Sequence, residues 1–159
     1  QLRGTREELA EKVRETLERI RAQEREIRTL KDKLASGQGT DLAAGAIEVA
    51  GTKVIAARVP GADSGSLRTA VDQLKSRLGS AIIVLAAVES PTKVVLVAGV
   101  TPDRVGLIKA GELVGAVAAQ IGGKGGGRPD FAQAGGNNPQ ALDAALASVL
   151  PQVRARLPG

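Results

Sequence analysis

The sequence predicts an α/β protein, with a small mixed β-sheet and packed helices preceded by a long coiled-coil helix. Apolar residues recur at heptad spacing near the start of the chain, which is typical of a helix in a coiled coil. The remainder alternates short β-branched runs with helical patterns and glycine-containing or proline-containing turns. We therefore expect a helix over residues 1–36 and a glycine-rich α/β domain over residues 37–159.

The first predicted element is a helix that carries an apolar stripe made of two seven-residue series. Thr16 and Gln23 interrupt the second series, so pairing should be weaker than in a leucine zipper. The partner is either a second copy, which would give a homodimer, or an upstream helix of the same chain. Gly37 is well placed to end the helix. The candidate oligomerisation residues are Leu9, Val13, Ile20, Ile27, Leu30 and Leu34.

A β-hairpin and a helix should open the α/β domain. Residues 46–50 and 53–59 have strand character and are separated by a turn. Ser64 or Ser66 can cap the helix that follows, because a side-chain oxygen accepts a hydrogen bond from a free N–H of the first turn. Gly79 closes this helix.

Two continuous apolar runs, over residues 81–88 and 93–100, predict the centre of the sheet, because such runs suit strands covered on both faces. Helical patterns follow over residues 109–121 and 139–157, with a glycine-rich loop between them. We expect Pro151 to interrupt the last helix, because proline cannot donate to the helical ladder.

Composition excludes many enzyme classes. The chain has no His and no Cys, so it lacks the usual zinc ligands, thiol nucleophiles and histidine triads. We expect no metal and no cofactor, and Asp103 and Glu112 do not form a persuasive catalytic pair. The absence of cysteine favours a cytoplasmic location, and no apolar run predicts a membrane segment. Because the chain begins without Met inside an apparent helix, we expect a piece of a longer protein.

The most informative motif is GGKGGGRPDFAQAGG, over residues 122–136. Glycines let a backbone approach a phosphate or ribose, and consecutive N–H groups can bind an anion. Lys124 and Arg128 add charge, within a net charge of +5. The alternative is that the glycines allow only tight packing or form a linker, although the ordered RPDFAQ stretch is unlike a linker. The motif is neither a P-loop nor a dinucleotide-binding turn.

Several polar residues accompany this motif. Asp130 and Gln133 would hydrogen-bond either to a ribose or base of a ligand or to the loop's own backbone. Phe131, the only aromatic residue, could stack on a base, but a core anchor is the favoured interpretation. Lys93 and Lys109 rank below Lys124 and Arg128, because a charge at a strand or helix edge is usually solvated. The candidate nucleic-acid-binding residues are Lys124, Arg128, Gly125, Gly126, Gly127, Gln133 and Lys109.

At these residues the sequence resembles the C-terminal domain of alanyl-tRNA synthetases, in which a helix carrying AGEL, here residues 110–113, leads into the GGKGGGRPD-x-AQAGG segment. The resemblance extends across nearly the whole chain. It implies a non-catalytic domain that contacts the tRNA elbow and helps the aminoacylation and editing modules act on one tRNA. The implied partners are alanine tRNA and the catalytic and editing domains of a parent alanine–tRNA ligase.

Two other functions stay open. One is an oligomerisation or assembly module of the synthetase, in which the coiled coil pairs and the glycine segment merely packs. The other is the binding of a small phosphorylated ligand, because a related fold forms the substrate-binding subdomain of DHH-type phosphoesterases. A histidine commonly lies in the glycine segment of those enzymes, and this chain has none.

Overall fold

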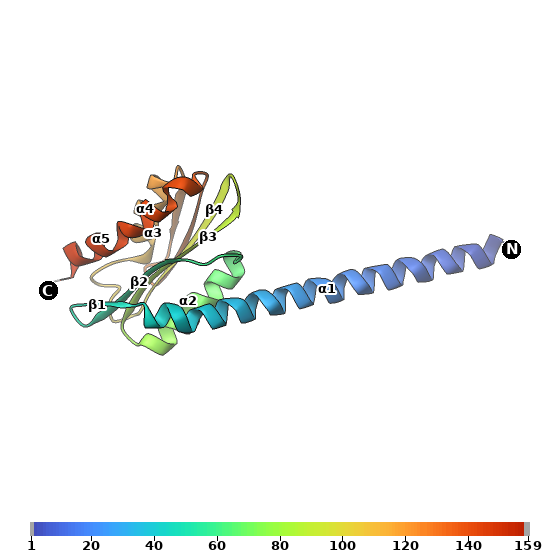
Figure 1. Cartoon of the computed structure of the whole chain (residues 1–159), viewed down its shortest axis with the longest axis horizontal. Helices are drawn as coiled ribbons and strands as arrows, with labels where there is room; N and C mark the ends of the chain where they lie inside the picture. The colour runs from blue at the N-terminus through green and yellow to red at the C-terminus, as the bar shows by residue number, and fades with distance from the viewer. Residues whose placement is uncertain (1, 158–159) are drawn as a thin grey trace.

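The computed structural model describes the backbone of residues 2–157 and the side chains of residues 5–30 and 42–157. A six-stranded mixed sheet has helices on both faces, and the long first helix projects away from it (Figure 1). The predicted fold class is therefore confirmed. In chain order the elements are α1 (Leu2–Ala44), β1 (Ile47–Val49), β2 (Thr52–Arg58), α2 (Ser64–Leu78), β3 (Ala81–Ser90), β4 (Lys93–Val100), α3 (Ala110–Gln120), β5 (Lys124–Gly127), β6 (Phe131–Gly136), a 3₁₀ turn (Pro139–Ala141), α4 (Leu142–Ala147) and α5 (Val149–Arg156).

The sheet has the strand order β1-β2-β3-β4-β6-β5. β2 and β3 run parallel and are joined by α2, whereas all other neighbouring strands are antiparallel. The prediction that the two apolar runs form the sheet centre is confirmed, since β3 and β4 lie in the middle and are buried along most of their length. The predicted first hairpin is also confirmed, with Ala50 and Gly51 in its turn at positive φ.

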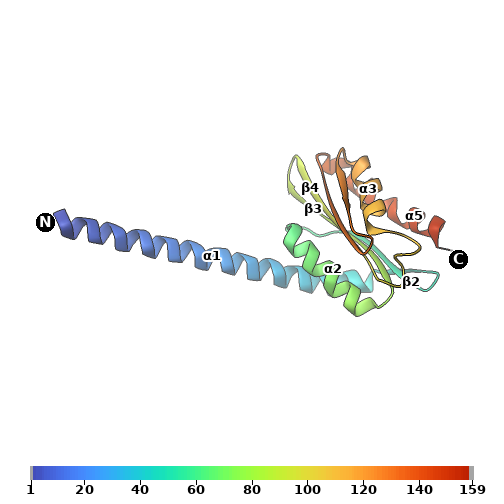
Figure 2. The same cartoon turned by 180° about the vertical axis from the view of Figure 1, so that it is seen from behind.

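Each face of the sheet has its own apolar core. On the face that we call the α2 face, Ile83 and Leu85 pack with residues of α2. On the opposite face, the α3 face, Ile82 and Val84 pack with residues of α3, α4 and α5. This division follows from the alternation of side chains along a strand. Figures 1 and 2 show α2 on one side of the sheet and α3 and α5 on the other.

The limits of α2 follow from its two end residues. Its N-cap is Asp63, and not Ser64 or Ser66 as we predicted. The Asp63 carboxylate accepts a hydrogen bond of 2.8 Å from the backbone N–H of Ser66, which satisfies a free donor of the first turn. Gly79 ends the helix as predicted, at a φ of 76° that favours glycine.

The first helix is longer than predicted. α1 continues through Gly37 and ends at Ala44. A glycine inside a helix costs only about 1 kcal/mol relative to alanine. The packing of Leu42 and Ala43 against the core on the α2 face offsets that cost by anchoring the last turn. α1 also packs along α2. A division into two domains at residue 37 stays an expectation.

The last helical segment breaks at Ser148, between α4 and α5, rather than at Pro151. Proline has no N–H to donate to the carbonyl four residues earlier, and its ring clashes with that carbonyl in a regular helix. For Pro151 this carbonyl belongs to Ala147, so the break falls directly after Ala147. Pro151 then lies in the first turn of α5, where an N–H has no partner within the helix.

Candidate nucleic-acid interface

The predicted loop over residues 122–136 is wrong, because this segment forms the antiparallel hairpin of β5 and β6. Close packing explains most of its glycines. A Cβ atom at Gly123 would lie 1.7 Å from the carbonyl oxygen of Gly135, and one at Gly125 would lie 2.0 Å from the Cβ of Ala134. Both distances are far below van der Waals contact. Glycine is therefore required by the fold at these two positions.

Gly126 is the exception within β5. A Cβ atom added there meets nothing within 4 Å, and its φ lies outside the left-handed region. The surface above Gly126 is therefore open, and the fold does not require glycine at this position. Of the three glycines in the strand, Gly126 is the one at which an added Cβ atom would meet open space.

Lys124 and Gln133 lie together on the α2 face, beyond the part that α2 covers. The register pairs Lys124 with Gly135 and Gly126 with Gln133, which places these positions on one face of the hairpin. Both side chains are exposed and line a shallow hollow of about 350 Å³ with Ser64 at the start of α2. We call this hollow, floored by β4 and β6, the sheet hollow.

Lys109 and Arg128 lie elsewhere. Lys109 precedes α3 and lines a second hollow of about 240 Å³ with Gly126 and Gly127. Arg128 is in the β5–β6 turn, where its Nε lies 3.4 Å from Oδ1 of Asp130 and both side chains are solvent-accessible. The structure therefore places Lys124 and Gln133 in one hollow and Lys109 in another, instead of in one site.

Hydrogen bonds hold the turn between β5 and β6. The backbone N–H of Arg128 donates to the carbonyl of Phe131 at 2.9 Å. The carbonyl of Asp130 accepts from the backbone N–H of Val100 at 3.0 Å and from Nζ of Lys75 at 3.2 Å. These contacts use the main-chain carbonyl of Asp130, whereas its carboxylate forms the ion pair with Arg128.

Phe131 is half-buried and packs against the core on the α2 face. The guanidinium carbon of Arg68 lies over its ring, 5.0 Å from the centroid. This arrangement agrees with the core-anchor interpretation and covers a face of the ring with a cation. Sequence reasoning missed Arg68 and Ser64, whose signal is their spacing of four residues on the exposed side of a helix.

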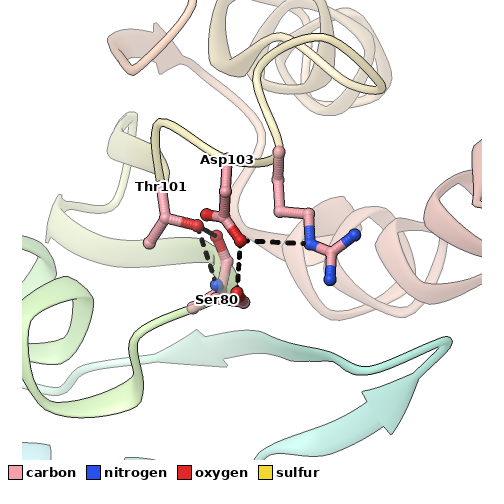
Figure 3. A network of polar contacts seen from close by, with 5 residues as sticks. Ser80, Thr101 and Asp103 are labelled. Carbon is pink, nitrogen blue, oxygen red and sulfur yellow. Dashed lines mark hydrogen bonds and ion pairs between the residues drawn. The ribbon is translucent and has the colours of Figure 1, made fainter.

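A polar network joins the start of β3 to the end of β4 (Figure 3). The Ser80 hydroxyl donates to the Asp103 carboxylate, which lies 3.5 Å from Nε of Arg104. The Thr101 hydroxyl accepts from the backbone N–H of Ala81 at 3.0 Å. The pKa of Asp103 lies below its ordinary value, mainly because the hydrogen bond from Ser80 stabilises the ionised carboxylate.

Glu112 has a different partner. It forms an ion pair with Arg156, whose hydrogen bond is the main cause of a lowered pKa at Glu112. Asp103 and Glu112 thus belong to separate structural contacts. Among the described residues, no group of three or more His, Cys, Asp or Glu side chains could hold a metal ion. No helix in that part of the chain is long and apolar enough to cross a membrane.

We expect Asp103→Asn to remove a pH-dependent part of the stability. The pKa of Asp103 is lower in the folded state than in the unfolded state, so its carboxylate stabilises the fold above the unfolded-state pKa of about 4. This contribution is lost as pH falls through the folded-state pKa. The difference in urea midpoint between the wild type and the variant should shrink between about pH 6 and about pH 3. A constant difference would contradict the role of the ionised carboxylate.

Comparison with known proteins identifies the family. Residues 51–155, from the β1–β2 turn into α5, match the DHHA1 domain. The chain belongs to the DHHA1 domain family. The alanine–tRNA ligase of Paracidovorax citrulli is 54% identical over 98% of this chain and 16% of that protein. The enzyme of Methylobacillus flagellatus is 55% identical over 94% of this chain and 17% of its own length. The chain thus spans about one sixth of these curated relatives.

Solved structures agree with a DHHA1 fold. The C-Ala domain of Aquifex aeolicus alanyl-tRNA synthetase superposes with a TM-score of 0.63 at 24% identity, covering 69% of this chain and 97% of that one. A DHH-domain member of the s1p family of ribosomal proteins gives a TM-score of 0.52 at 13% identity, covering 82% and 32%. The resemblance to alanyl-tRNA synthetases is therefore confirmed by sequence relatives, and the DHHA1 fold by structure.

Proposed function

We propose that this DHHA1 domain binds tRNA as the C-terminal domain of an alanine–tRNA ligase. It contacts the tRNA elbow and helps the aminoacylation and editing modules of the parent chain act on one tRNA. The observation that carries this proposal is the 54% identity to an alanine–tRNA ligase over 98% of the chain. A chain without His or Cys suits a binding role better than a catalytic one.

The charges on the hairpin support RNA binding. Lys124 is exposed and forms no ion pair with any residue whose side chain is described. Arg128, in contrast, is partly neutralised by Asp130. A free cation can approach a phosphate and release counterions from the RNA, whereas a paired one must first give up its carboxylate. Lys124 should therefore contribute more than Arg128 to tRNA affinity.

We expect Lys124→Ala to weaken tRNA binding about fivefold and to lower the magnitude of the log–log salt slope by somewhat less than about one unit. Arg128→Ala should have a smaller effect, because the ion pair with Asp130 already reduces the attraction that Arg128 can offer to a phosphate. Fluorescence anisotropy with labelled alanine tRNA across a salt series measures both quantities. Both side chains are exposed, so the circular-dichroism spectrum should not change.

Arg154→Ala is the matched control, since Arg154 is an exposed cation on α5, which packs on the opposite face. A tRNA footprint with the wild-type chain tests the elbow assignment. Protection confined to the acceptor stem would overturn contact with the elbow. Unchanged affinity and salt slope for Lys124→Ala and Arg128→Ala would make the hairpin a packing element without an RNA role.

An assembly module of the synthetase is the second candidate function. The observation in its favour is the apolar stripe of α1, whose described side chains from Leu9 to Leu30 are between 45% and 58% exposed. Such a stripe stabilises a coiled coil when a partner covers it. The two functions are compatible, because the stripe and the sheet hollow are formed by different residues.

A further inference from the structure

The sheet hollow is bordered by polar side chains with free hydrogen-bonding groups. Lys124, Gln133 and Ser64 all line it. None of the three side chains makes a hydrogen bond or ion pair with another side chain in the described part of the chain. The hollow therefore has a positive charge at Lys124 without a neutralising partner.

Arg68 adds a planar cation beside this hollow. It lies one helical turn after Ser64 on α2, and its exposed guanidinium group lies over the ring of Phe131. Phe131 and Gln133 are two residues apart on β6, so both side chains point to the α2 face. Arg68 is not among the residues that line the hollow, but its contact with the Phe131 ring holds an exposed cation on the same face of the sheet, two residues along β6 from the position of Gln133.

We infer that the sheet hollow binds an unpaired nucleotide of RNA. Its base stacks on the guanidinium of Arg68, the edge of the base bonds to Gln133, and Lys124 contacts a phosphate. An arginine plane is a stacking surface for splayed bases, and an amide both donates to and accepts from a base edge. This inference rests on the proposed function and adds which part of an RNA the domain recognises.

The residue types favour an unpaired nucleotide over a duplex. Double-stranded RNA is bound mainly by its shape and by contacts to phosphates and 2′-hydroxyls across its minor groove, none of which needs a stacking surface. A guanidinium plane and a free amide suit an unstacked base, because the base can stack on the plane and hydrogen-bond to the amide through its edge. The hollow, of about 350 Å³, is shallow and open to solvent. Its occupant is therefore bound on a surface instead of being enclosed, as a single strand is on proteins that bind it through stacking.

Arg68→Lys tests whether a base stacks on Arg68, because lysine keeps the positive charge but lacks the planar guanidinium group. The probe is a fluorescein-labelled oligouridine of about eight nucleotides, and the competitor is a blunt RNA duplex of the same length. We expect Arg68→Lys to weaken binding of the single strand about five- to tenfold with an unchanged salt slope. The same change at the control position, Arg154→Lys, should have no effect. Gln133→Ala should weaken binding about threefold, because one hydrogen bond is lost.

The outcomes separate this inference from the proposed function. If the chain binds tRNA but Arg68→Lys leaves affinity for the single strand unchanged, or the duplex competes as well as the single strand, the inference is wrong and the proposed function stands. If the single strand binds in an Arg68-dependent manner and tRNA does not bind, the inference stands and the proposed function is wrong. Failure of both RNAs to bind rejects both.

Discussion

Gly123→Ala should destabilise the domain by about 3 kcal/mol, whereas Gly126→Ala should leave its stability unchanged. The two glycines flank Lys124 and Gly125 in the same segment, but their surroundings differ. A Cβ atom at Gly123 collides with the carbonyl of Gly135, a backbone atom that can move only if β6 moves, whereas one at Gly126 meets open space. Urea unfolding followed by circular dichroism measures both free energies. Equal midpoints for the two variants would mean that the hairpin packs differently in solution.

The same contrast makes Gly126 a suitable position for a binding test. Gly126→Val places a branched side chain on the open surface beside Gln133, the residue opposite it in the hairpin. Valine is favourable in a strand, so the fold should persist while the approach of RNA is obstructed. We expect weaker tRNA binding at unchanged unfolding free energy. That result would explain glycine at residue 126 by access to the backbone, whereas packing explains glycine at residue 123.

Periodicity was sufficient to predict elements whose own side chains determine their structure. The runs that became β3 and β4 are apolar throughout, and α2 has a buried stripe and a terminal Gly79. β5 and β6 could not be predicted in this way, because KGGG has no strand propensity. They form strands because β6 pairs with β4, a strand more than 30 residues earlier, and because α3 packs over glycines without side chains. Those causes lie outside the segment.

The candidate site, like β5 and β6, could be predicted only in part from the sequence. The residue types of Lys124, Gln133 and Lys109 indicated contact with RNA, but their division between two hollows depends on strand register and on the position of α3. The spacing of Arg68 and Ser64 predicts only that they share one side of a helix, because the contact of Arg68 with Phe131 depends on where α2 crosses the sheet. Residue types thus gave a prediction of RNA contact, whereas tertiary structure determines which of these residues lie together.

The stripe of α1 should make the intact chain associate, and Ile20→Glu should raise the dissociation constant of that association about 100-fold or more. Burial of an isoleucine contributes about 1.5–3 kcal/mol, a dimer buries two copies, and each 1.4 kcal/mol is a factor of about ten. Ile20 is 45% exposed, and its neighbours in the stripe, Val13 and Ile27, are 56% and 53% exposed. The side chain of Leu34, the last predicted member, lies outside the described residues. Sedimentation equilibrium over a concentration series measures the constant.

Ala22→Glu is the matched control, because it adds the same charge to an exposed position of α1 outside the heptad series. Its association should equal that of the wild type. Deletion of residues 1–36 should give a folded monomer, since Leu42 and Ala43 remain to pack against the core on the α2 face. If the intact chain sediments as a monomer at high concentration, homodimerisation is wrong. The exposed stripe then requires a helix from elsewhere in the parent chain, because an uncovered apolar seam of this length is unfavourable in water.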